Sequence, residues 1–151
     1  MSSSQQELQA LSQELQQIEE QIEALQGSVE EIRNEQTAVD EAIDAVESLE
    51  SGSIVQVPLG GGAYVRAEVQ DIDEVIVELG GDYAAEFEQD DAVDTLDSKA
   101  DRLDDRIDEV TEEISELEAE STQLEQQAQQ LQQQAMQQQM GALGGQGEPD
   151  E

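Results

Sequence analysis

The sequence predicts an α+β fold, a long antiparallel coiled-coil hairpin with two central β-hairpins that pair with other subunits. Both halves of the chain repeat apolar residues at helical spacing, whereas the middle alternates them as strands do. Aromatic residues make up only 2% of the 151 residues, so a thick globular core is improbable and a thin, extended architecture fits better.

Residues 1–50 are expected to form the first coiled-coil helix. Their apolar residues follow one another in steps of three and four, with Gln36 as the one interruption. This spacing is a heptad seam, and no proline breaks it. The seam consists of Leu8, Leu11, Leu15, Ile18, Ile22, Leu25, Val29, Ile32, Val39, Ile43, Val46 and Leu49.

Residues 53–88 are expected to form two β-hairpins used for oligomerisation. Strands are predicted at 54–59, 63–69, 74–79 and 83–87, with glycine-rich turns at 60–62 and 80–82. Isolated hairpins are marginal in water, so their apolar face needs strands from neighbouring chains, although packing within the chain remains an alternative. The candidate assembly residues on this face are Val55, Val57, Leu59, Val65, Val69, Val75, Val77, Leu79 and Phe87.

Residues 90–140 are expected to form the second coiled-coil helix, and 141–151 a flexible tail. The seam of the second helix consists of Val93, Leu96, Ala100, Leu103, Ile107, Val110, Ile114, Leu117, Ser121, Leu124, Ala128, Leu131 and Ala135. If the chain doubles back, residues that face each other across the seam should have numbers adding to a constant. Val46 with Leu96 and Leu11 with Leu131 both total 142, as do the other pairs of their layer, and the pairs of the intervening layer, such as Ile43 with Ala100, total 143. This match favours pairing within one chain over zippers between chains.

The seam weakens towards both ends of the chain, where leucines face alanines and glutamine-rich segments follow. We expect the helix ends to splay there and to expose adaptable apolar side chains. The candidate binding residues at these tips are Leu8, Leu11, Leu131, Met136, Met140 and Leu143.

Charge and residue inventory exclude many functions. Thirty-nine acidic residues against five basic ones leave a net charge of -34, which argues against nucleic acid and anionic membranes as partners. Cysteine and histidine are absent, which removes thiolate metal sites, cysteine nucleophiles and imidazole bases. We therefore expect no enzyme activity and no cofactor. The sequence also lacks an apolar run of the roughly 20 residues needed to span a bilayer, so a cytoplasmic protein is expected.

Other features have simpler explanations than a site. The glycines at 60–62 precede neither a lysine nor a helix, so they predict a turn and not a phosphate loop. Acidic clusters at 71–74 and 90–94 lack the pattern of a calcium loop and arise from composition, so no metal site is expected. The acidity itself indicates adaptation to high salt, because the Debye length falls to about 3 Å at 1 M.

The order of heptad helix, IVQVPLGGGAYVRAEV, DEVIVELGGDYAAEF and heptad helix resembles the alpha-class subunit of archaeal prefoldin, a hexameric chaperone. VPLGGGAYV is a specific match, and the second hairpin points to the alpha class. The resemblance covers residues 5 to 140. It implies a hexamer of two alpha and four beta-class subunits, whose strands form a β-barrel body that bears six coiled-coil tentacles.

The resemblance also implies an ATP-independent holdase, which captures non-native polypeptides at the splayed tips and delivers them to a group II chaperonin. The residues leave two alternatives open. One is a structural coiled-coil scaffold with inert tips, and the other is an acidic chaperone that binds basic proteins through charge.

Overall fold

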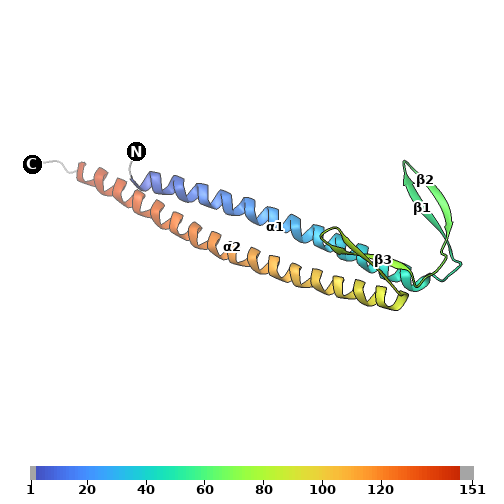
Figure 1. The fold of residues 1–151 in the computed structure, drawn as a ribbon. Helices are drawn as coiled ribbons and strands as arrows, with labels where there is room; N and C mark the ends of the chain where they lie inside the picture. Colours follow the sequence, from blue (N-terminus) through green and yellow to red (C-terminus); the bar gives the residue numbers. More distant parts are fainter. Residues whose placement is uncertain (1–2, 147–151) are drawn as a thin grey trace, which may run out of the picture. The chain divides into compact units, whose positions relative to one another are not determined.

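The computed structural model describes residues 3–146, with side chains described as far as residue 141. In sequence order one long helix precedes and one follows two β-hairpins (Figure 1), so the predicted α+β class and the order of elements are confirmed. The elements are α1 (Ser3–Ser48), β1 (Ile54–Gly60), β2 (Ala63–Glu68), β3 (Val75–Gly80), β4 (Tyr83–Phe87) and α2 (Gln89–Gln146).

Helix α2 runs further than expected, into the segment that we predicted to be a tail. Residues 126–140 are rich in glutamine, alanine and methionine, which are good helix formers, and the helix continues through residues 141–146 although three of these are glycine. Residues 147–151 of the predicted tail lie outside the described residues.

The chain divides into two units. One consists of Met1–Val29 with Glu109–Glu151, and we call it the terminal unit; the other is Glu30–Asp108, the hairpin unit. The terminal unit thus joins the first part of α1 to the last part of α2, while the hairpin unit contains both β-hairpins and the adjoining parts of the helices.

In both helices the predicted seam residues are the ones withdrawn from solvent. Every one of them is buried or half-buried, while most of the residues between them are exposed. The exposed fraction falls below a tenth for Ile18 and Val29 in the terminal unit, and for Ile32, Val39, Leu96 and Leu103 in the hairpin unit. The heptad spacing therefore predicted correctly which side of each helix is covered.

A polar residue occupies the interrupted seam position and links the helices within the hairpin unit. The side-chain amide of Gln36 donates a hydrogen bond to the backbone oxygen of Ala100, at 3.5 Å, and another to the carboxylate of Asp104. A residue of α1 thus contacts α2 where an antiparallel return of the chain requires it. A half-buried amide is tolerated in an apolar seam because it has these partners.

The β-hairpins are antiparallel and share one turn design. In the first, Val55 pairs with Ala67 and Val57 with Val65; in the second, Val77 pairs with Ala85. Each turn has two central residues at positive φ, Gly61 and Gly62 in one and Gly81 and Asp82 in the other. This conformation matches the right-handed twist of strands, and glycine adopts it without strain.

The regular alternation that we expected stops just before each turn. The pairing shifts between Pro58 and Gly60, and again between Glu78 and Gly80. Leu59 and Leu79 therefore have no cross-strand partner, because each is the extra residue of a bulge. The tight two-residue turns require this shift, which side-chain alternation alone does not reveal.

The junction between α1, the hairpins and α2 is held by side-chain hydrogen bonds. The side-chain amide of Gln89, the first residue of α2, donates to the backbone oxygens of Val46 and Leu49, at 2.8 and 2.9 Å. Its backbone N–H donates to the carboxylate of Asp73 at 3.3 Å. One residue thus satisfies carbonyls at the end of α1 while an aspartate caps the start of α2.

Candidate functional site

The terminal unit has a shallow groove between its two helices. It is lined by Glu7 of α1 and by Gln127, Gln130, Leu131 and Gln134 of α2, and its volume is about 330 Å³. From Gln127, the lining of α2 continues three and four residues on, at Gln130 and Leu131, and then at Gln134, so these residues share one face of the helix. The groove places the beginning of α1 beside the return helix, as the antiparallel prediction requires.

The structure places the predicted tip residues at separate sites of the terminal unit. Leu131 lines the groove, while Leu8 lines a separate hollow on α1 with Gln5, Gln9 and Ser12. Leu8, Leu11 and Leu131 are half-buried in the seam. The side chain of Leu143 lies outside the described residues.

Among the side chains of this unit that the structure describes, Met136 and Met140 are large apolar residues that are exposed. Their exposed fractions are 63% and 70%, and they lie one helical turn apart on α2. Large exposed apolar side chains that recur along one helix favour contact with another molecule. Methionine suits partners of varied shape because its side chain is flexible and polarisable.

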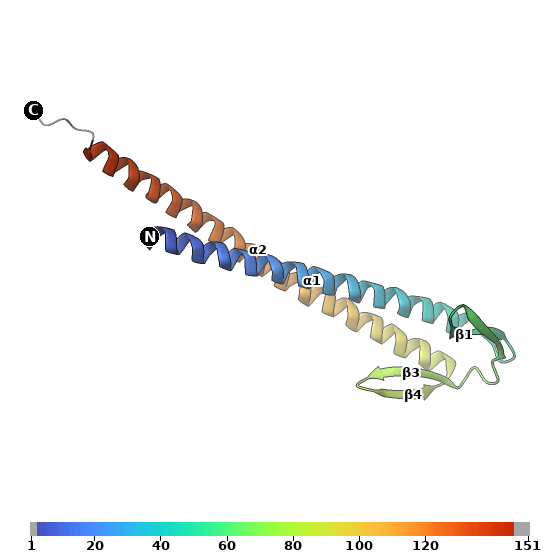
Figure 2. The same cartoon turned by 90° about the horizontal axis from the view of Figure 1, so that it is seen from above.

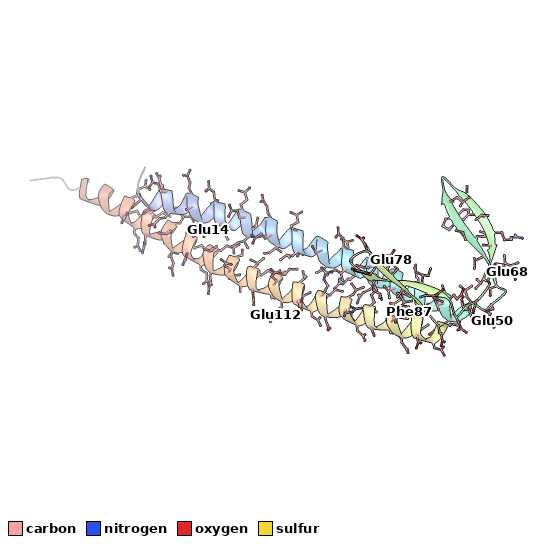
Figure 3. All side chains as sticks on the ribbon, in the orientation of Figure 1. Glu14, Glu50, Glu68, Glu78, Phe87 and Glu112 are labelled. Carbon is pink, nitrogen blue, oxygen red and sulfur yellow. The ribbon has the colours of Figure 1, made fainter. Side chains whose placement is uncertain are left out.

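The chemistry of this surface changes sharply along α2. From residue 109 to 125 there are seven glutamates, but from 126 to 141 there is no charged residue and there are ten glutamines. All ten are exposed. Figure 3 shows the dense cover of side chains on both helices, with Glu14 and Glu112 among the exposed carboxylates. The glutamines of the groove were missing from our candidate residues, although their repeated pairs in the sequence are a visible signal.

The β1–β2 hairpin exposes apolar side chains on both faces. Val57 and Val65 are paired on the predicted face and are 40% and 45% exposed. Ile54 and Tyr64 alternate with them, on the opposite face, and are 65% and 62% exposed. The prediction considered one face only, so it missed this second apolar surface. Within the hairpin unit, β1 and β2 stand clear of the helices (Figure 1).

The β3–β4 hairpin is different, because one of its faces packs inside the hairpin unit. Val77 is only 5% exposed, and Val75 and Phe87 are half-buried. The strands run beside the first turns of α2 (Figure 2), where the ammonium group of Lys99 donates to the backbone oxygen of Glu78 at 3.5 Å. Burial of Val77 in its own chain leaves little of that side chain for another subunit.

Apolar side chains also remain outside this packed face. The exposed fractions of Ile76, Leu79 and Tyr83 are 73%, 45% and 75%. Val55 and Val69 of the other hairpin are half-buried, while Leu59 is 66% exposed at its bulge. The exposed strand residues that the predicted assembly set did not contain thus include Ile54, Tyr64, Ile76 and Tyr83.

The acidic residues of the linker between the hairpins have structural roles. The Asp71 carboxylate accepts the backbone N–H of Asp73 at 3.0 Å, as in an Asx turn, and Ser51 accepts the N–H of Ile72 at 3.1 Å. Within residues 3–141, no group of acidic side chains is arranged so that it could hold a metal ion. No helix in the described part of the chain is long and apolar enough to cross a membrane.

Comparisons with known proteins agree with this architecture. The family model described as prefoldin subunit matches residues 18–134. A prefoldin subunit alpha of Halorubrum lacusprofundi is 70% identical over 99 residues, which span 66% of this chain and 65% of that protein. One from Halobacterium salinarum is 67% identical over 95 residues, 63% of this chain and 62% of that protein. The chain thus spans just under two thirds of the length of these relatives.

A solved structure supports the same fold. A cryo-EM structure described as filamentous PFD from Methanocaldococcus jannaschii superposes with a TM-score of 0.66 and 24% sequence identity, and the match covers 75% of this chain and 96% of that chain. The family match covers well over half of the chain, and the curated relatives carry the same class name that the hairpin motifs predicted. The chain therefore belongs to the prefoldin subunit family, in which it resembles the archaeal alpha subunits.

Proposed function

We propose that this chain is the alpha-class component of an ATP-independent holdase, which captures non-native polypeptides at the terminal unit and passes them to a group II chaperonin. It acts in the cytoplasm, in a hexamer of two alpha and four beta-class subunits. Neither a cofactor nor a metal is needed, because holding a client requires exposed surface and no bond is made or broken.

One observation carries this proposal, namely the exposed methionines on the same helix as the glutamine-lined groove. Met136 and Met140 offer apolar surface on a part of α2 whose own seam residues, Ala128 and Ala135, are small, and methionine can adapt its shape to different clients. Each contact is weak, but several tips that hold one client together gain avidity through effective concentration. The preceding part of α2, residues 109–125, has seven glutamates and is a poor candidate for apolar capture.

The exposed hairpin side chains support the assembly part of the proposal. A two-stranded hairpin with apolar residues on both faces is marginal alone. Ile54, Tyr64 and Ile76 extend the predicted assembly surface, and pairing with strands of other subunits would cover them in a β-barrel body. The mass of the complex formed with a beta-class subunit in high salt tests this, and a monomer at every mixing ratio would contradict it.

Light scattering of a denatured client tests the capture itself. The assembled complex should suppress aggregation, and M136Q/M140Q should weaken capture about 10-fold because two exposed apolar side chains are lost. A matched control is Ala119→Gln, at another exposed position of α2 in the same unit. Absence of suppression by the unmodified complex would favour the inert scaffold. Suppression that vanishes in molar salt would favour the acidic chaperone of basic proteins, since charge attraction is screened there.

A further inference from the structure

We infer that the glutamine-rich groove of the terminal unit binds the exposed peptide backbone of unfolded acidic chains through side-chain amide hydrogen bonds. This inference rests on the proposed function and names the class of client and the chemistry that recognises it. Apolar contact by the methionines remains part of capture. The amides add hydrogen bonds to the main chain of the client, which is exposed in every unfolded polypeptide.

The distribution of charge is the first support. A chain with a net charge of -34 has charge-free side chains throughout residues 126–141 of α2. Covering a carboxylate with a client removes its water and is expensive, and salt does not abolish that penalty at contact distance. An amide is far less costly to cover. The glutamine segment is therefore the part of this surface on which another acidic chain can lie.

The hydrogen-bonding capacity of the groove is the second support. A glutamine amide both donates and accepts, whereas a carboxylate only accepts. Gln127, Gln130 and Gln134 lie along one side of a groove of about 330 Å³, and all three are exposed. A peptide group needs one donor and one acceptor, so a row of amides fits an extended segment. The one charged group of the lining, Glu7, can accept a backbone N–H.

The neighbouring apolar residues complete the surface. Leu131 lies in the groove among the glutamines, and Met136 is exposed on the same helix beyond them. An extended segment alternates its side chains to opposite faces, so alternate residues can contact apolar surface while the backbone faces amides. Recognition of this kind is tolerant of sequence, because it depends on the backbone and on a few adaptable apolar contacts.

The test compares three double variants in the assembled complex. Q127E/Q134E keeps the shape but adds charge and removes donors, while Q127M/Q134M removes hydrogen bonding and adds apolar surface. T111E/S115E is the control, because it adds the same charge at exposed positions of α2 in the same unit. Glutamate and methionine form helices about as well as glutamine, so α2 should persist, and far-UV circular dichroism checks this.

The probe is dye-labelled, reduced and carboxymethylated α-lactalbumin, an acidic protein that stays unfolded. Binding is measured by fluorescence anisotropy in about 3 M KCl, where long-range charge effects are screened. Each net hydrogen bond corresponds to roughly 2- to 10-fold in Kd, so both groove variants should bind at least about 4-fold more weakly. The control should stay within about 2-fold of the unmodified complex.

Other results would overturn the inference in distinct ways. If Q127M/Q134M binds as tightly as the unmodified complex or more tightly, capture is apolar and the amides are not used. If Q127E/Q134E also binds normally, the client does not cover the groove. Either result would leave the proposed holdase standing. If the unmodified complex fails to bind the probe at all, the proposed function and this inference fail together.

Discussion

The glutamine that links the two helices at the hairpin junction offers a sharp test of how this fold is held together. The side-chain amide of Gln89 donates to the backbone oxygens of Val46 and Leu49 at 2.8 and 2.9 Å. In Gln89→Glu the side chain keeps its shape but has no hydrogen to donate. Two carbonyl groups near the end of α1 would then lose their partner.

The magnitude follows from the contacts. Each hydrogen bond contributes roughly 0.5–1.5 kcal/mol, so losing both costs about 1–3 kcal/mol. A new carboxylate near the C-terminal carbonyls of α1 is unfavourable by roughly 0.3–1 kcal/mol, but in the first turn of α2 it is favourable by a similar amount, about 0.3–1 kcal/mol. These two dipole effects nearly cancel, so the expected loss in the free energy of unfolding remains about 1–3 kcal/mol.

The assay is urea unfolding at constant high salt and constant protein concentration, followed by far-UV circular dichroism. Guanidinium is unsuitable because it is itself a salt. Gln89→Met should lose a similar amount, since it removes the donor without adding charge. Gln129→Glu is the matched control at an exposed position of α2 and should change the free energy by at most about 0.5 kcal/mol. A Gln89→Glu protein as stable as the unmodified one would refute the junction reasoning.

Three further predictions concern salt, core packing and glycine conformation. With a net charge of -34, the chain should lose helical circular dichroism as salt falls from about 3 M to about 0.1 M, where the Debye length reaches about 10 Å, and helicity that is independent of salt would contradict this. Leu103 is 6% exposed, so Leu103→Ala should lower the free energy of unfolding by about 2–5 kcal/mol in urea. The control Asp101→Ala, at an exposed position, should lower it by at most about 0.5 kcal/mol. Gly27→Ala should stabilise the folded protein by up to about 1 kcal/mol, because Gly27 is exposed in a helix with open space around it. Gly60→Ala should destabilise it, because Gly60 has a φ of 96°. Changes of the same sign in the free energies of unfolding of the two variants would refute the conformational argument.

The periodicity of the sequence was sufficient to predict the helices, their covered sides and their antiparallel return. Heptad spacing is a local property that reports directly which side of a helix needs a partner. The interruption at Gln36 was visible in the sequence, but its hydrogen bonds to Ala100 and Asp104 depend on residues more than sixty positions away. The local sequence pattern shows that a polar residue at this position is unusual, but it does not show which groups accept its hydrogen bonds.

The hairpins mark the limit of that reasoning. Alternation and glycine turns predicted four strands with nearly correct bounds, yet both hairpins looked equivalent in the sequence. In the folded chain one packs Val77 beside α2, while the other leaves Ile54 and Tyr64 exposed. Composition and spacing alone established the strands, the acidic surface and the glutamine segment of α2. Which strand face is covered depended on where the chain folds back on itself, because burial arises from contacts between segments that are distant in sequence.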